Sequence, residues 1–305
     1  MTRPAWLFSG QGAQALGMGK ALAGRYPEAA RTFDEANDAL GFDLRALCWD
    51  GPAAELDRTA NAQPALLATS IAALRAGLAA GLRLDDPILA GHSLGEFSAL
   101  VAAGALSLAD GLRLVRRRGE LMQAADAAGG MAAVLGLDAD RIARAIDGTG
   151  IVIANDNAPG QVVISGPLAA FADATTALRA AGAKRVLSLR VSGAFHSPAM
   201  RAVAPQLAEA IAAVTWRELR YPIVANVDAL PHEHASDFPA LLERQVYSPV
   251  RWLESVRRLA AEGATSFIEF GAGTVLTGLV KRILSDARTA NVSDPESLER
   301  ALPTG

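Results

Sequence analysis

The chain has 305 residues, of which 51% are hydrophobic and 20% are charged, so it can bury a large core and is neither disordered nor fibrous. Its formal charge of −3, with no long basic block, gives no global electrostatic case for binding nucleic acid or an anionic membrane. Cys48 is the only cysteine, which excludes an intramolecular disulfide.

The N-terminal sequence MTRPAWLFSGQG lacks the sustained apolar segment and the cleavage site of a secretory signal. The apolar stretch at residues 65–84 is interrupted by arginines, and no other run approaches the length of a membrane span. We therefore expect a cytoplasmic protein without a membrane partner.

The first predicted element is the strand PAWLF (residues 4–8), which leads into the glycine-rich turn SGQGAQ and a long helical region at about residues 16–47. The segment from Gly10 to Ala15 fits the G-x-G-x-x-A pattern of dinucleotide-binding loops. Such a unit should reach a second strand with an acidic residue about twenty residues later, whereas GRYPEAARTFDEANDAL predicts a helix. The turn is therefore a poor candidate for a dinucleotide site.

A second helix is predicted at about residues 64–80, followed by the strand DDPILAG (residues 85–91). In the next segment, GHSLG fits G-x-S-x-G between a strand and a helix, which is the pattern of a nucleophile elbow. The glycines allow a tight turn, the hydroxyl of Ser93 is held clear of the sheet, and the helix N-terminus supplies N–H donors. The setting favours a nucleophilic Ser93 over an ordinary tight turn.

The helix DGLRLVRRRGELMQAA (residues 110–125) places Arg118 on its apolar face, whereas Arg113, Arg116 and Arg117 fall on the opposite, solvated face. A buried arginine left unpaired costs about 3–5 kcal/mol, so Arg118 needs an anionic partner. This partner is either a protein carboxylate in a structural salt bridge or a substrate carboxylate held by two hydrogen bonds.

From about residue 131 to residue 189 the pattern changes and predicts strand, helix, strand, strand, helix, strand, which is the ferredoxin-like order. The earlier style returns with strands at residues 221–227 and 265–271 and a helix at residues 274–284. The predicted fold class is therefore α/β, with a mainly parallel sheet. Residues 1–128 and 198–305 form the large domain, and residues 129–197 form a small inserted ferredoxin-like subdomain.

A serine nucleophile needs a base, and the chain has four histidines. His92 adjoins Ser93 but points elsewhere on a turn, so we expect it to shape the pocket. His232 and His234 lie in the polar stretch PHEHASD, which predicts a solvated loop and offers too few ligands for a metal. His196 lies where the small lobe ends, and clefts between domains favour substrate sites. Elimination favours His196 as the base, with a structural, hydrogen-bonded histidine as the alternative.

The position of His196 also bears on the reaction class. In α/β-hydrolases the catalytic histidine normally comes late in the chain, whereas here at least two further strands are predicted after it. An ordinary esterase topology therefore fits poorly.

Six motifs now carry a family resemblance. GQGAQ, GHSLGE, the arginine of RRRGELMQ, AFHS, ANVD and FIEFGAGTVLTGL occur in the order, and at about the spacing, of the malonyl-CoA:acyl carrier protein transacylases, which the chain resembles over nearly its whole length. The resemblance implies a hydrolase-like α/β domain with an inserted ferredoxin-like subdomain. It also implies ping-pong transfer of a malonyl group from malonyl-CoA to the phosphopantetheine thiol of acyl carrier protein in fatty-acid biosynthesis. No cofactor and no metal are implied, and we expect a monomer.

The resemblance further implies roles for individual residues. The backbone N–H groups of Gln11 and Leu94 form the oxyanion hole, and a backbone carbonyl near Arg251 orients His196, because no acidic triad member is evident. Many members have glutamine at the position of Arg251 and proline at that of Ser9.

Substrate-binding roles are implied for a further set of residues. Arg118 clamps the malonyl carboxylate, and Phe195, with Leu94, resembles the malonyl-selective pattern of the family. Asn157 and Asn226 match polar residues near the family's active site, although buried asparagines commonly serve as turn or strand caps.

Other functions remain open at this point. The chain could be a thioesterase or editing hydrolase, a non-catalytic acyl-binding subunit, or a stand-alone acyltransferase serving a polyketide synthase or malonate decarboxylase. Carrier proteins of this kind are acidic, so docking needs a local basic surface. Its candidates are Arg113, Arg116, Arg117, Lys184, Arg185, Lys281 and Arg282.

Overall fold

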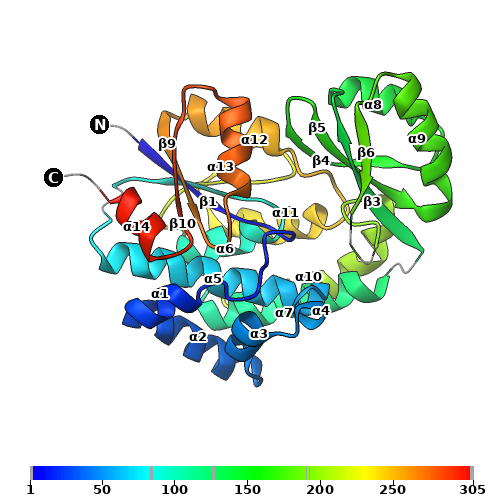
Figure 1. Cartoon of the computed structure of the whole chain (residues 1–305). Coiled ribbons are helices and arrows are strands. Elements are labelled where there is room, and N and C mark those ends of the chain that lie inside the picture. Colours follow the sequence, from blue (N-terminus) through cyan, green and yellow to red (C-terminus); the bar gives the residue numbers. More distant parts are fainter. Residues whose placement is uncertain (1–2, 83–84, 126–127, 190, 192, 303–305) are drawn as a thin grey trace.

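The computed structural model describes residues 3–82, 85–125, 128–189, 191 and 193–302. Figure 1 shows a large α/β body and, beside it, a small lobe drawn in green. Arg190, within the strand predicted at residues 183–191, lies outside the described residues.

The large sheet has the strand order β10-β9-β1-β2-β7-β8. All of its described pairings are parallel except that of β7 with β8, so the predicted mainly parallel sheet is confirmed. Its strands are β1 (Arg3–Phe8), β2 (Ile88–Gly91), β7 (Ile223–Val224), β8 (Pro231–His232), β9 (Ala264–Phe270) and β10 (Arg288–Val292).

The central strand β1 is apolar because both of its faces are covered. Trp6 and Phe8 pack into the core shared with the N-terminal helices, whereas Ala5 and Leu7 pack into a second core on the other face. A parallel strand buried on both faces is expected to read as a continuous apolar run, as PAWLF does. In Figure 1, α2, α5 and α7 lie on one side of the sheet, and α12 and α13 lie on the other.

The helices of the large body begin and end as follows: α1 (Lys20–Arg25), α2 (Pro27–Leu40), α3 (Leu44–Asp50), α4 (Ala53–Leu56), α5 (Thr59–Ala79), α6 (Leu94–Ala102), α7 (Leu108–Ala125), α10 (Ala204–Ala212), α11 (Phe238–Gln245), α12 (Trp252–Ala261), α13 (Val275–Ile283) and α14 (Pro295–Ala301). Short 3-10 helices lie at Pro198–Val203 and Ala235–Asp237.

The helical region predicted at about residues 16–47 is present, and the structure divides it into α1, α2 and α3. Pro27 is the first residue of α2 and has no N–H to continue the preceding helix. Gly41 ends α2 in the left-handed conformation, with a φ of 73°, which glycine adopts at little cost.

The small sheet is antiparallel and has the order β4-β5-β3-β6. Its elements are β3 (Gly129–Leu135), α8 (Ala139–Ala145), β4 (Val152–Ala158), β5 (Gln161–Pro167), a 3-10 helix (Leu168–Ala170), α9 (Phe171–Ala180) and β6 (Arg185–Ser188). Strand order and connections together confirm the predicted ferredoxin-like arrangement.

Helix α13 lies at the boundary between the two sheets (Figure 1). Its first turn is held by the buried carboxylate of Glu269 at the end of β9, which accepts hydrogen bonds from the N–H groups of Leu276 and Thr277. A carboxylate at a helix N-terminus is favoured by the helix dipole and fixes the start of the helix. No helix in the described part of the chain has the length and apolarity needed to cross a membrane.

Candidate active site

The predicted nucleophile elbow is present between β2, which ends at Gly91, and α6, which begins at Leu94. Ser93 has a φ of 52° and a ψ of −103°, a conformation that costs energy for a residue with a side chain and recurs at catalytic turns. A Cβ on Gly95 would collide with the backbone carbonyl of Phe8, so glycine lets the elbow pack closely on the end of β1. The strand–turn–helix setting predicted for Ser93 is confirmed.

Two amide side chains hold the backbone of Ser93 on both sides. Asn226 accepts a hydrogen bond from the Ser93 N–H at 2.7 Å and donates one to the Gly91 carbonyl at 2.7 Å. The Nε2 group of Gln245 donates to the Ser93 carbonyl at 2.9 Å. Because a buried polar group without a partner is costly, these bonds compensate for the strained turn and fix it in one conformation.

His196 is the histidine that meets the serine. Its Nε2 lies 2.7 Å from Ser93 Oγ, and its Nδ1 lies 2.9 Å from the carbonyl oxygen of Gln245 and 3.2 Å from that of Ser248. A carbonyl can only accept, so Nδ1 carries the proton and the lone pair of Nε2 faces the hydroxyl. This geometry suits a general base acting on Ser93.

The expectation that a carbonyl near Arg251 orients His196 is wrong in its residue. Arg251 precedes the first turn of α12, and its carbonyl accepts hydrogen bonds from the N–H and the hydroxyl of Ser255. Its guanidinium pairs with Glu254 and has no contact with the histidine. The start of α12 thus uses the carbonyl of Arg251, and the carbonyls of Gln245 and Ser248, at and after the end of α11, orient the ring.

His196 is buried, with 4% of its surface exposed. Burial, together with the positive charge of Arg118, lowers the pKa of His196 to about 3. The ring is therefore neutral, and able to accept a proton, at neutral pH.

The glycine turn lies directly against the elbow, since a Cβ on Gly10 would collide with the carbonyl of His92. The side-chain Nε2 of Gln11 donates a hydrogen bond to Oγ1 of Thr59 at 3.1 Å. Within the described residues, the backbone N–H groups of Gln11 and Leu94 have no acceptor, and both residues line the same cavity as Ser93. Free N–H groups beside a nucleophile can stabilise an oxyanion.

Arg118 points at the nucleophile from α7 and has 1% of its surface exposed. Its Nη2 donates to Ser93 Oγ at 3.0 Å and to Gln245 Oε1 at 2.9 Å, and its Nη1 donates to Gln63 Oε1 at 2.8 Å. Burial lowers the pKa of Arg118 to about 10, so the guanidinium is still charged at neutral pH. In the part of the chain that the structure describes, it pairs with no carboxylate, so the structural salt bridge weighed above is not observed.

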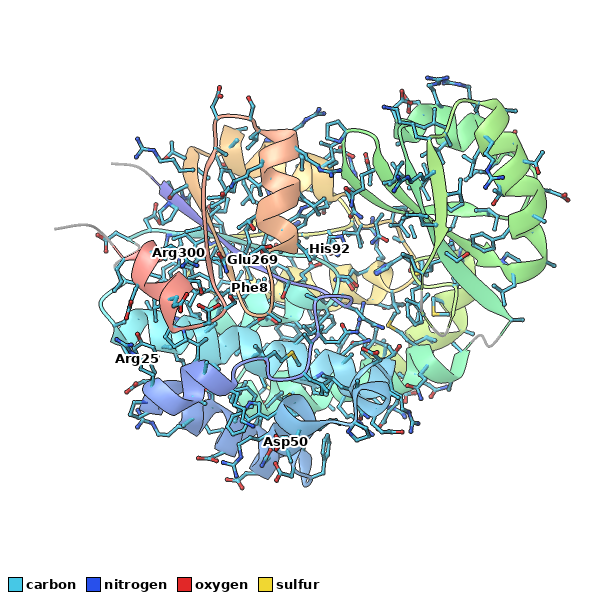
Figure 2. The ribbon with its side chains drawn as sticks, viewed as in Figure 1. Phe8, Arg25, Asp50, His92, Glu269 and Arg300 are labelled. Carbon is cyan, nitrogen blue, oxygen red and sulfur yellow. The ribbon has the colours of Figure 1, made fainter. Side chains whose placement is uncertain are left out.

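These groups meet in a cavity of about 510 Å³ between the large body and the small sheet. Phe195 lines it and is buried. Figure 2 shows His92 between α13 and the small sheet, where its Nε2 lies 2.8 Å from Oδ1 of Asn157 on β4. A larger cavity of about 790 Å³ lies elsewhere, over Trp6 and the end of α5, and contains none of the predicted site residues. Chemistry, not size, therefore identifies the site.

The remaining predicted residues lie outside this cavity. His232 does not lie in a solvated loop: it belongs to β8 and its ring nitrogens lie 3.1 Å from carboxylate oxygens of Asp228 and Asp237. His234 is exposed, as expected. The described residues contain no cluster of three His, Cys, Asp or Glu side chains that could hold a metal ion.

The arginines predicted as a solvated basic face are largely neutralised by neighbours. Arg113 pairs with Asp110, and Arg116, which is only half-exposed, pairs with Glu120. By contrast, Arg282 on α13 donates at 2.7 Å to Gln161, a neutral residue that lines the cavity. Arg282 is therefore a predicted basic residue that contacts the lining of the cavity.

Sequence reasoning missed Gln63, Glu96 and Gln245. Gln63 stands just before the apolar run of α5 and is itself buried, so it needs a buried polar contact. Glu96 is buried within the GHSLGE motif, and its Oε2 accepts from Gln245 Nε2 at 2.7 Å. Burial raises the pKa of Glu96 to about 7. Gln245 gave no signal, because it stands at the end of an ordinary amphipathic helix.

The family model described as "Acyl transferase domain" matches residues 5–299. The chain belongs to this acyltransferase family. The malonyl CoA-acyl carrier protein transacylase of Bacillus subtilis is 46% identical to this acyltransferase, over 100% of this chain and 98% of that protein. The enzyme of the same name from Escherichia coli K12 is 43% identical, over 99% of each chain.

Solved structures agree with these relatives. An acyl carrier protein S-malonyltransferase from Vibrio cholerae has a TM-score of 0.94 at 42% identity and covers 98% of this acyltransferase and 99% of its own chain. A malonyl-transacylase in complex with a type II polyketide acyl-carrier protein has a TM-score of 0.95 at 43% identity, over 99% of both chains. The resemblance stated from the six motifs is confirmed.

Proposed function

We propose that this acyltransferase moves a malonyl group from malonyl-CoA to the phosphopantetheine thiol of an acyl carrier protein, through a malonyl ester on Ser93. The observation that carries this proposal is the contact of one hydroxyl with both a neutral base and an arginine that has no carboxylate partner among the described residues. The base supports nucleophilic attack, and the arginine supports a substrate with a free carboxylate. The names of the full-length relatives support the same donor and acceptor.

In the first half-reaction, Ser93 Oγ attacks the thioester carbonyl of malonyl-CoA while its proton passes to Nε2 of His196. The N–H groups of Gln11 and Leu94 stabilise the negative oxygen of the tetrahedral intermediate. The C–S bond then breaks, coenzyme A leaves as the thiol with the proton from His196, and the malonyl-serine ester remains. Arg118 holds the malonyl carboxylate throughout.

In the second half-reaction, the carrier thiol enters the same cavity and gives its proton to His196. Its sulfur attacks the ester carbonyl, the same two N–H groups stabilise the oxyanion, and the bond to Ser93 Oγ breaks. The proton returns from His196 to Oγ, which restores the free enzyme. His196 takes up and returns the proton in both half-reactions, and no atom is oxidised or reduced. The proposed chemistry therefore needs no cofactor.

The decisive experiment follows the fate of the malonyl group. The protein is incubated with malonyl-CoA, with and without a panel of phosphopantetheinylated carrier proteins from fatty-acid and polyketide synthesis, and every product is weighed by mass spectrometry. We expect malonyl-carrier to form much faster than free malonate, with the fatty-acid carrier as the best acceptor. Release of malonate at the same rate without any carrier would instead identify a hydrolytic thioesterase.

A polyketide acceptor is the second candidate, and a specific observation favours it. The polyketide biosynthesis protein ThaF of Burkholderia thailandensis is 45% identical over 92% of this chain, although the match covers only 24% of that protein. Preference for a polyketide carrier in the panel would select this alternative.

Replacing Arg118 by Ala should lower kcat/KM for malonyl-CoA by about 100-fold, while acetyl-CoA is transferred as well as before or better, because the variant removes the carboxylate clamp and its buried charge together. Arg118→Lys should recover only part of the loss, since an ammonium cannot form two parallel hydrogen bonds. Because Phe195 leaves little room for a branch, methylmalonyl-CoA should be a poor substrate of the wild type. The measurement is kcat/KM for all three thioesters, and equal losses for all of them in Arg118→Ala would show a purely structural arginine.

A further inference from the structure

The guanidinium of Arg118 is held entirely by neutral acceptors. Gln63, Gln245 and the hydroxyl of Ser93 accept its hydrogen bonds at 2.8, 2.9 and 3.0 Å. The ring of Phe97 lies 5.3 Å from the guanidinium carbon and adds a contact without charge. On the same helix, the exposed Arg113 and the half-exposed Arg116 each pair with a carboxylate. The buried arginine is thus oriented but not neutralised by a direct ion pair.

The carboxyl group of Glu96 acts on Arg118 without a direct hydrogen bond, because the side-chain amide of Gln245 lies between them. The carboxylate of Glu96 favours the charged form of Arg118, but it is the Nε2 group of Gln245 that contacts Glu96, at 2.7 Å. Gln245 therefore lies between the carboxyl group of Glu96 and the guanidinium of Arg118, and these two buried groups form no direct ion pair.

The orientation of both amides follows from their neighbours. An arginine can only donate and the backbone carbonyl of Ser93 can only accept, so Oε1 of Gln245 faces Arg118 and Nε2 faces Ser93 and Glu96. For Gln63, Oε1 faces Arg118, and Nε2 lies 3.6 Å from the sulfur of Met122, a weak acceptor. Reversing either amide would place two donors against each other.

We infer that Gln63 and Gln245 are specificity-determining positioning residues: their neutral amides aim the Arg118 guanidinium into the cavity while leaving its charge for the carboxylate of the substrate. This inference rests on the proposed function. A carboxylate at either position would form the ion pair that the malonyl group is meant to form. The substrate would then bring a second negative charge into a buried site that already has one.

The test is Gln63→Glu, which keeps the size of the side chain and exchanges the amide for a carboxylate. Ser93 acylation by malonyl-CoA and by acetyl-CoA is followed by intact-protein mass spectrometry without a carrier protein. We expect the rate with malonyl-CoA to fall roughly 10- to 100-fold and the rate with acetyl-CoA to change by no more than about threefold. Equal losses with both substrates, or an unchanged ratio, would overturn the inference.

Gln206→Glu is the matched control, because Gln206 accepts a hydrogen bond at 3.1 Å from the exposed Arg117, outside the cavity. It should leave both acylation rates unchanged, and a loss of malonyl preference in this variant would count against a local effect at Arg118. If Gln63→Glu does not fold, Gln63→Met replaces it, because it removes the amide that orients Arg118 without adding a charge. It should lower the rate with malonyl-CoA and leave the rate with acetyl-CoA within about threefold.

A binding measurement separates this inference from the proposed function. Free malonate should raise the Tm of the wild type more than acetate does, and Gln63→Glu should lose that difference. If the wild type formed no malonyl adduct, the proposed function would fail, while the Tm difference would still test the amides. A malonate effect of the same size in both proteins would refute the role of Gln63.

Discussion

Replacing Ser93 by Ala should abolish the covalent malonyl adduct, which we expect to form when the wild type is mixed with malonyl-CoA. No other hydroxyl in the described structure lies at 2.7 Å from the base and 3.0 Å from Arg118, so no neighbouring group should take over the attack. Intact-protein mass spectrometry detects the adduct, and peptide mapping of the wild type locates it.

Ser98 provides the matched control for this variant. It lies on α6, the helix that follows Ser93, and is buried, and its hydroxyl makes no hydrogen bond within the described residues. Ser98→Ala should therefore form the adduct as the wild type does. An adduct that survives in Ser93→Ala would show that the elbow does not supply the nucleophile.

Replacing His196 by Ala should lower the rate of malonyl transfer by about 10²–10⁴, the usual contribution of a positioned general base. The variant leaves Ser93, Arg118 and the oxyanion donors in place, so binding of malonyl-CoA should change far less than kcat. The measurement is single-turnover acylation of Ser93, which isolates the chemical step from the release of products.

His232→Ala and His234→Ala are the comparisons for His196. His234 is exposed, and His232 contacts Asp228 and Asp237 away from the cavity, so both variants should acylate at nearly the wild-type rate. Similar losses in all three proteins would mean that elimination selected the wrong histidine.

The parts of the site that sequence could predict are those with a local pattern. The elbow depends on Gly91, Ser93 and Gly95, whose spacing and position between an apolar strand and a helix are visible in the chain. The apolar face of α7 likewise predicted that Arg118 is buried, and the structure agrees. The order of strands and helices in the small lobe predicted its fold, because each of its elements is short and separated by clear turns.

The parts that could not be predicted depend on distant backbone groups. Every residue type has a backbone carbonyl that could orient a histidine, so nothing in the sequence marks Gln245 or Ser248 for this role, and the resemblance implies only a carbonyl near Arg251. The side chain of Gln245 touches Ser93, Glu96 and Arg118, which come from separate parts of the chain and meet only after folding. The strand β10 was missed because it is a partly exposed edge strand with little apolar patterning.

The large body positions both reacting groups, since Ser93 follows β2 and the ring of His196 is held by carbonyls at and after the end of α11. The small sheet supplies wall residues instead, among them Met131, Ala133 and Val163. Substitutions in this wall can enlarge or narrow the acyl pocket without moving the nucleophile relative to its base. The small lobe is therefore one part of the molecule in which substitutions can change the shape of the acyl pocket while Ser93, His196 and Arg118 are kept.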